Sequence, residues 1–149
     1  MSARVGVVLF PGTNCELDVS WAVEQLGGTA RIVWHTETSL DDLDAVVIPG
    51  GFAHGDYLRT GAIAKLSPVM DAVRRMAAAG GPVVGICNGF QILTEAGLLP
   101  GALQKNAGLT FRCETVGVRV ESSDSALTSG AEAGRVLQLP INHFEGNYV

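Results

Sequence analysis

Short runs of apolar residues alternate, along the first two thirds of the chain, with segments whose apolar residues have helical spacing. The runs are rich in valine and isoleucine, which favour strands, and they are too short to predict helices. Because few polar side chains interrupt them, we expect strands that are buried on both faces, as in a parallel sheet. The predicted strands are Arg4–Phe10, Thr29–Trp34, Ala45–Ile48 and Pro82–Ile86.

Helices are predicted between these strands. In Glu16–Leu26, Leu17 and Trp21 lie one helical turn apart, which predicts an apolar face and places Trp21 in the core. Leu66–Ala79 is the second predicted helix, and a pair of glycines ends each of the two segments. The order strand, helix, strand predicts parallel strands joined by right-handed crossovers, so the expected fold class is a doubly wound α/β sheet.

The last third of the chain has a different pattern. Beyond Pro100, the segments Thr110–Glu121 and Arg135–Leu139 predict two strands with a polar loop between them. The sequence contains no repeat, low-complexity tract or linker, and 149 residues with a hydrophobic content of 47% are enough to build one core. We therefore expect residues 1–149 to form a single domain.

Charge and cysteine content argue against several classes of function. With 10 Lys+Arg against 15 Asp+Glu the formal net charge is -5, so nucleic acid and anionic membranes are not expected partners. No apolar stretch has the length of a membrane span, and no signal peptide is recognised. Cys15, Cys87 and Cys113 lack CxxC spacing, which argues against a disulfide framework or a zinc site and favours the reducing cytoplasm.

The segment Pro82–Leu93, PVVGICNGFQIL, places one cysteine between a predicted strand and a segment with helical character. In open α/β sheets ligands bind at the carboxyl ends of strands, which is where Cys87 lies. Gly85 and Gly89 flank it at the spacing of the GxSxG nucleophile elbow, and a helix N-terminus favours the thiolate. A lone cysteine is more often a small core residue, but the flanking glycines favour a nucleophile.

A thiolate that attacks a carbonyl group needs donors for the oxyanion. The strand Ala45–Ile48 leads into PGG, where Gly50 and Gly51 allow the Gly51 N–H to turn toward Cys87. The N–H of Asn88, next in sequence to the nucleophile, is the second predicted donor. An ordinary turn explains PGG equally well when it is taken alone. Its combination with the elbow favours an oxyanion hole.

These residues also carry a family resemblance. GICNGFQIL resembles the GxCxGxQ elbow of class I, triad-type glutamine amidotransferases, which have a flavodoxin-like architecture, and PGG resembles their oxyanion loop. Further motifs, which span nearly all of the chain, resemble more narrowly the glutaminase subunits of phosphoribosylformylglycinamidine synthases. They are FPGTNCELD (Phe10–Asp18), PGGFAHGDYLRTGAIA (Pro49–Ala64), LQKNAGLTFRC (Leu103–Cys113) and PINHFEGNY (Pro140–Tyr148).

The resemblance implies a glutaminase. Cys87 would attack the side-chain amide of glutamine and release ammonia, and water would hydrolyse the glutamyl thioester. A large synthase subunit would use the ammonia, with ATP and magnesium, to make formylglycinamidine ribonucleotide in purine biosynthesis, and a small accessory subunit would complete the assembly. No cofactor is expected in this chain itself, which lacks a GxxxxGK[ST] loop.

A glutamine pocket follows from the same resemblance. His54 and Asp56, in a glycine-bounded loop, could form an acid–base pair, but the resemblance favours a pocket wall or a partner-facing loop for the GDYLR sequence. The residues expected to hold glutamine or to shape its pocket are Gly50, Phe52, Gln91, Asn106 and Phe111.

The general base has two alternative interpretations. His143 and Glu145 form the one HxE sequence of the chain and would point to the same side if both lay on a strand. The resemblance instead assigns PINHFEG to an internal motif and the catalytic pair to a later HPE-type segment, which residues 1–149 do not contain. We therefore expect a chain without its C-terminal elements and its histidine–glutamate pair, in preference to a relocated pair.

A second class of function also fits the elbow. A noncatalytic member of the same α/β superfamily, a thiol-based stress or binding protein, would use Cys87 as a readily oxidised thiol. Reaction of Cys87 with a glutamine-like electrophile distinguishes this alternative from a glutaminase.

Overall fold

The computed structural model describes residues 2–149, which form two compact units. The first unit ends at Ala102, and the second is Leu103–Val149. The single domain expected over residues 1–149 stays a prediction. No helix within residues 2–149 has the length and apolar character that crossing a bilayer requires.

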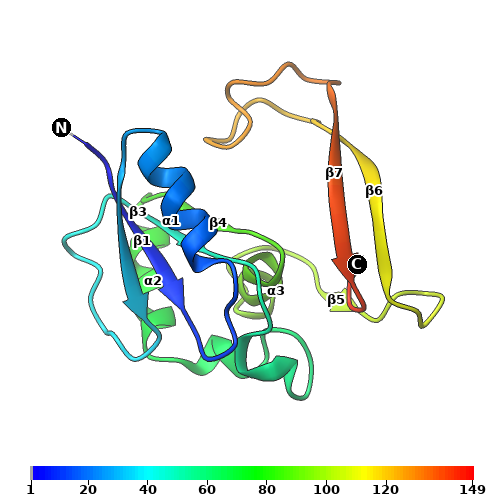
Figure 1. Cartoon of the computed structure of the whole chain (residues 1–149), viewed down its shortest axis with the longest axis horizontal. Helices are drawn as coiled ribbons and strands as arrows, with labels where there is room; N and C mark the ends of the chain where they lie inside the picture. Colours follow the sequence, from blue (N-terminus) through cyan, green and yellow to red (C-terminus); the bar gives the residue numbers. More distant parts are fainter. Residues whose placement is uncertain (1) are drawn as a thin grey trace. The chain divides into compact units, whose positions relative to one another are not determined.

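A four-stranded parallel sheet forms the centre of the first unit (Figure 1). Its strands, all at the predicted positions, are β1 (Arg4–Leu9), β2 (Thr29–Trp34), β3 (Ala45–Ile48) and β4 (Val83–Gly85). The order is β2-β1-β3-β4, so that Val7 of β1 pairs with Ile32 on one side and Val47 on the other. This sheet confirms the predicted α/β fold class.

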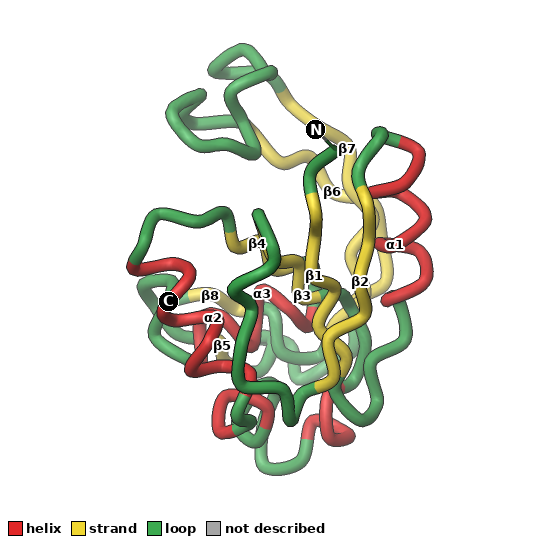
Figure 2. Tube along the Cα trace, turned by 90° about the vertical axis from the view of Figure 1, so that its left-hand side faces the viewer, coloured by secondary structure: helices red, strands yellow, loops and turns green. Residues whose placement is uncertain are grey.

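Helices cover both faces of this sheet (Figures 1 and 2). The helix α1 (Glu16–Gln25) lies against β1 and β2 on one face, and α2 (Val69–Ala78) and α3 (Asn88–Glu95) lie on the other. Two short 3-10 helices, η1 (Ala53–Asp56) and η2 (Ala64–Leu66), lie between β3 and α2. The carboxyl ends of β3 and β4 therefore lead into η1 and α3, through the PGG and GICNG motifs.

The main core lies between the sheet and the face covered by α2 and α3. Val46 and Ile48 of β3 are fully buried there, as are Met70 and Val73 of α2. Burying a side chain of this size stabilises the fold by about 1.5–3 kcal/mol. Other members of this cluster are Val8, Phe10, Val33, Ile92 and Leu93.

Helix α1 and the edge strand β2 are more exposed than the sequence predicts. Trp21, expected in the core, is 64% exposed, and α1 has no buried residue. Ile32 and Trp34 of β2 are also exposed, so this strand is not buried on both faces. Both predictions are wrong because helical periodicity shows which side chains share a face but not what covers it, and an edge strand has only one neighbour.

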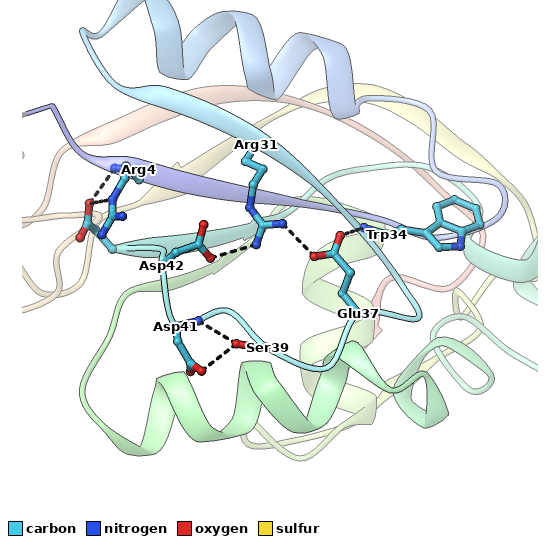
Figure 3. A network of polar contacts seen from close by, with 8 residues as sticks. Arg4, Arg31, Trp34, Glu37, Ser39, Asp41 and Asp42 are labelled. Atoms are coloured by element: carbon cyan, nitrogen blue, oxygen red, sulfur yellow. Dashed lines mark hydrogen bonds and ion pairs between the residues drawn. The ribbon is translucent and has the colours of Figure 1, made fainter.

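A polar network holds the connection between β2 and β3 (Figure 3). The Arg31 guanidinium donates to the Glu37 carboxylate at 2.8 Å and to Asp42 at 3.3 Å. Glu37 also accepts a hydrogen bond from the Trp34 N–H at 2.9 Å, and the Arg31 hydrogen bond is the largest cause that lowers its pKa. These charge-assisted bonds fix the path of the chain as it enters β3.

The second unit contains two small antiparallel sheets, in which β5 pairs with β8 and β6 with β7. Their bounds are β5 (Leu103–Gln104), β6 (Arg112–Arg119), β7 (Val136–His143) and β8 (Asn147–Tyr148). The two strands predicted in this region are present, although β7 continues beyond Leu139. Within residues 103–149 Val120 is the one buried apolar side chain, so this unit has little core of its own.

We predict that Gly89→Ala strongly destabilises the first unit. A β-carbon at position 89 would lie 1.9 Å from the Ile48 carbonyl oxygen, which belongs to the backbone of β3 and cannot move without distorting the sheet. We expect the free energy of unfolding in urea to fall by about 3 kcal/mol, the upper range for overpacking a core. Gly130→Ala is the control, since a β-carbon there has no neighbour within 4 Å. Equal stability of the two variants would contradict the prediction.

Candidate active site

Cys87 occupies a strained turn between β4 and α3. Its backbone has φ 53° and ψ -111°, a region that side-chain-bearing residues rarely adopt, and the residue is exposed. Such strain persists only where the surrounding structure enforces it, and it concentrates at functional sites. The structure thus contains the tight strand-to-helix turn that the glycine spacing predicts; the catalytic role of Cys87 stays a prediction.

Gly85 and Gly89 make this turn possible because backbones approach closely there. A β-carbon on Gly85 would lie 2.6 Å from the carbonyl carbon of Gly89, and one on Gly89 would overlap the carbonyl oxygen of Ile48. Only glycine fits at either position without displacing backbone. Helix α3 therefore begins directly against the ends of β3 and β4, with Cys87 at its N-cap position.

The PGG loop is held in place by the loop that follows β1. The Gly50 carbonyl accepts hydrogen bonds at 3.2 Å from the N–H groups of Asn14 and Cys15, and the Phe52 N–H donates to the Gly12 carbonyl at 2.8 Å. These bonds flank an isolated antiparallel bridge between Thr13 and Gly51. In such a pair the flanking residues carry the bonds, so the Gly51 N–H points away from the bridge and not into it.

This loop lies against the elbow. The point at which a β-carbon would stand on Gly50 is 3.4 Å from Cβ of Cys87 and 3.5 Å from Sγ of Cys15. The structure therefore brings together Gly50, Gly51, Cys87 and the first residue of α3, Asn88, four residues that the sequence placed in one site. It also adds Cys15, whose position beside the elbow no motif spacing predicts.

The side chain of Asn88, which sequence reasoning did not consider, is buried in a hydrogen-bond network. Its Oδ1 accepts from the Ala53 N–H at 3.0 Å, and its Nδ2 donates to Asp56 at 3.1 Å and to Gln91 at 3.0 Å. Gln91, expected at the glutamine pocket, is itself buried on α3 beside Asn88, whereas Phe52 is exposed. A polar side chain at the first position of a helix, next to the glycine-flanked Cys87, is the signal that could have indicated this network.

The segment after the PGG loop has an unusual backbone. His54, Asp56 and Leu58 all have positive φ, at 53°, 52° and 71°. His54 and Asp56 both lie in η1, and their catalytic pairing is not tested by this geometry. Three such residues within five positions mark a segment whose conformation depends on its neighbours.

The far end of α3 is bound to the same segment through Glu95. Arg59 and Lys65 both make ion pairs with Glu95, whose side chain is 18% exposed. The Arg59 hydrogen bond is the largest cause that lowers the pKa of the Glu95 carboxyl, followed among the lowering effects by the Lys65 hydrogen bond. The charged form of Glu95 is thus the one that the fold holds.

In the second unit Asn106 is the centre of a separate hydrogen-bond network. Its Oδ1 contacts Nδ1 of His143 at 3.0 Å and accepts from the Gly146 N–H at 3.1 Å, while its Nδ2 donates to the carbonyls of Thr110 and His143. Asn106 is buried, and Phe111, also expected at the pocket, is 56% exposed.

His143 and Glu145 do not share a strand. His143 is the last residue of β7, and Glu145 lies in the bend that follows. The alternation that would place both on one side of a strand therefore does not apply. A β-carbon on Gly146 would lie 2.1 Å from the His143 ring, so the ring packs directly over Gly146. Whether the pair takes part in catalysis stays a prediction.

The described residues, 2–149, include no group of three or more His, Cys, Asp or Glu side chains placed to hold a metal ion. The elbow presents the exposed thiol of Cys87. Close to it, the pKa of the Cys15 thiol is raised, first by burial and then by the negative charges of Asp18, Cys87 and Glu16.

The fold and the elbow define a class of protein, an α/β amidotransferase domain in which a cysteine occupies the strand-to-helix turn. The sequence profile of the CobB/CobQ-like glutamine amidotransferase domain matches residues 2–149, and the chain belongs to this family.

Comparison with individual proteins identifies a narrower group of relatives within this family. The chain is 57% identical over 147 residues to the phosphoribosylformylglycinamidine synthase subunit PurQ of Koribacter versatilis, covering 98% of this chain and 64% of that protein. It is 58% identical over 145 residues to the protein of the same name from Thermus thermophilus, covering 97% of this chain and 64% of the relative. Both matches confirm the resemblance carried by the motifs.

A solved structure agrees with these matches. The structure of PurLQS from Thermotoga maritima superimposes with a TM-score of 0.94 at 41% sequence identity, covering 100% of this chain and 70% of that chain. This chain thus spans 64% of the length of the two curated relatives and 70% of the matched structural chain.

We predict that alkylation with iodoacetamide separates the two thiols at the elbow. Because the pKa of Cys15 is raised from its ordinary value of 9.0, less thiolate forms there at any given pH. Cys15 should therefore be alkylated more slowly than the exposed cysteines at pH 7.5, and its rate should rise with pH. Peptide mass spectrometry measures each site, with exposed Cys113 as the internal control. Equal rates at Cys15 and Cys113 at pH 7.5 would contradict the prediction.

Proposed function

We propose that this chain is the glutaminase part of a phosphoribosylformylglycinamidine synthase and that Cys87 is its nucleophile. The observation that carries the proposal is the positive-φ backbone of Cys87, which lifts the thiol out of the sheet next to the Gly50–Gly51 loop. A buried structural cysteine needs neither the strain nor the two flanking glycines. The match to synthase subunits at 57% and 58% identity supports the same activity.

In the proposed reaction the Cys87 sulfur attacks the side-chain amide carbon of glutamine. A C–S bond forms, the carbonyl oxygen takes the negative charge, and the N–H groups of Gly51 and Asn88 donate hydrogen bonds to it. The C–N bond then breaks, and ammonia leaves with a proton that it receives from the general acid. Water hydrolyses the thioester to glutamate and returns the thiol. Each oxyanion donor typically contributes about 2.7–4 kcal/mol to transition-state stabilisation.

The proton transfers require a histidine that takes the thiol proton and returns it to the leaving ammonia. In the family that the motifs resemble, the base and its orienting glutamate belong to an HPE-type segment, which this sequence does not contain. The Asn106 side chain contacts Nδ1 of His143, which favours a structural role for this histidine. We therefore keep His143 and Glu145 as the less favoured catalytic pair.

Glutamine binds, in this proposal, in the pocket that the motifs predict. Gly50, Phe52 and Gln91 lie on the loop and helix that meet at the elbow, which supports their assignment to glutamine binding. Asn106 and Phe111 remain proposed pocket residues on the strength of the motif resemblance alone.

Partner proteins, in this proposal, bind the substrate that accepts the ammonia. The relatives carry the name of a synthase subunit, which supports assembly with a large synthase subunit and a small accessory subunit. ATP and magnesium act in the large subunit, and this chain contributes no cofactor. The three free cysteines fit a location in the reducing cytoplasm.

We predict that Cys87→Ser abolishes glutamine-dependent synthesis by the assembled enzyme. External ammonia enters after the thioester step, so ammonia-dependent synthesis should remain close to that of the wild type. Formation of the amidine product, measured with glutamine and then with ammonium chloride, separates the two routes. Cys113→Ser is the matched control, because this cysteine is exposed on β6 in the other unit. Retention of glutamine-dependent turnover by Cys87→Ser would reject the nucleophile.

We also predict that the isolated glutaminase subunit hydrolyses glutamine slowly and that the synthase activates it. Ammonia is wasted without an acceptor, and the Gly50–Gly51 loop is held by a few hydrogen bonds that partner binding can reshape. We expect at least a tenfold rise in kcat for glutamine hydrolysis on assembly, about 1.4 kcal/mol. Glutamate release with and without the synthase measures it, and an unchanged kcat would exclude this form of coupling.

A further inference from the structure

The segment from Ala53 to Lys65 is attached along the whole length of α3. At the start of the helix, Asn88 binds the segment through Ala53 and Asp56. In the middle, Gly61 lies so close that a β-carbon there would be 3.0 Å from Cα of Ile92. At the end of the helix, Glu95 binds the segment through two cationic side chains. The segment from Ala53 to Lys65 is therefore held against α3 at both ends and in the middle.

Of the α3 residues that contact this segment, Asn88 is the one next to Cys87. Its side chain is 2% exposed, its oxygen is used by Ala53, and its amide nitrogen is shared between Asp56 and Gln91. At such burial, removal of a partner leaves an amide atom of Asn88 without its protein hydrogen bond, which is costly.

The hydrogen bond from Ala53 to Asn88 joins the two halves of the proposed oxyanion hole. Ala53 is two residues after Gly51, which supplies one proposed N–H donor, and Asn88 supplies the other from its own backbone. The side-chain oxygen of Asn88 thus links the loop that carries one donor to the residue that carries the other, and the amide that contains this oxygen is itself bonded to Asp56. An error of about 1 Å in such an arrangement can cost 10²-fold in rate.

We propose that the side chain of Asn88 is a positioning residue that, together with Asp56, sets the geometry of the oxyanion hole. This inference rests on the proposed glutaminase function. It gives Asp56 a role through Asn88, without acid or base chemistry of its own. It also explains why the segment tolerates positive φ at His54 and Asp56, since the hydrogen bonds to Asn88 hold η1 in that conformation.

The test is a charge-conserving exchange of the two side chains in the assembled enzyme. Asn88→Asp keeps an acceptor for Ala53 but places a carboxylate against Asp56, so kcat for glutamine hydrolysis should fall by about 10²-fold. Asp56→Asn keeps an acceptor for Asn88 and adds no charge, so kcat should fall far less than in Asn88→Asp. In the double variant the amide introduced at position 56 donates to the carboxylate introduced at position 88, and the Gln91 amide has to turn so that its nitrogen donates as well; kcat should then rise at least tenfold above that of Asn88→Asp.

Controls separate positioning from loss of folding. Asn142→Asp, on an exposed position of β7, makes the same substitution away from the site and should leave kcat unchanged. Asn88→Ala removes the acceptor for Ala53 without adding charge, so it should lower kcat and kcat/KM together, and Asp56→Asn should not rescue it. If Asn88→Asp fails to fold, an active, folded double variant still supports the pairing.

The possible outcomes are distinct for the two proposals. A wild-type assembly without Cys87-dependent glutaminase activity overturns the proposed function and this inference with it. An active wild type, combined with a folded double variant that is no more active than Asn88→Asp, overturns the positioning role alone. Full activity of Asn88→Asp or of Asn88→Ala overturns it as well.

Discussion

The close packing of backbone on backbone where α3 meets the sheet is the constraint on which the site depends. Gly89 lies against the Ile48 carbonyl and Gly85 against Gly89, so the chain can turn from β4 into α3 only within a very small space. The turn forces Cys87 into a positive-φ conformation, and the surrounding core offsets the cost of that conformation. The close packing at Gly85 and Gly89 therefore produces the turn at which the Cys87 thiol is exposed.

The loops around the elbow depend on this turn in two ways. The PGG loop uses its carbonyl and N–H groups to bind the loop after β1, which leaves the Gly51 N–H directed away from that bridge. The following segment is bound to α3 by side chains, through Asn88 at one end and Glu95 at the other. Displacement of α3 would therefore move the segment that continues from the PGG loop.

The two units use their polar residues differently. In the first unit the buried amide of Asn88 and the partly buried carboxylates of Asp56 and Glu95 join elements that surround the Cys87 elbow. In the second, Asn106 closes a local network with His143 and Gly146, and the β6–β7 pair presents mostly exposed side chains. His143 thus has a hydrogen-bond partner within its own unit, although its HxE spacing, taken alone, nominates it as a base.

The sequence by itself determined the strands of the parallel sheet, the strand-to-helix turn at Cys87 and the family. Those features depend on local patterns: β-branched runs, helical spacing and glycines at fixed distances from the cysteine. Only the tertiary structure decided that Trp21 and β2 remain exposed, that Cys15 lies beside the elbow and that the Asn88 amide binds Ala53 and Asp56. These features depend on residues that are far apart in the chain. The packing of distant elements decides which face of a helix or strand is covered and which group an amide binds, and no local pattern encodes that packing.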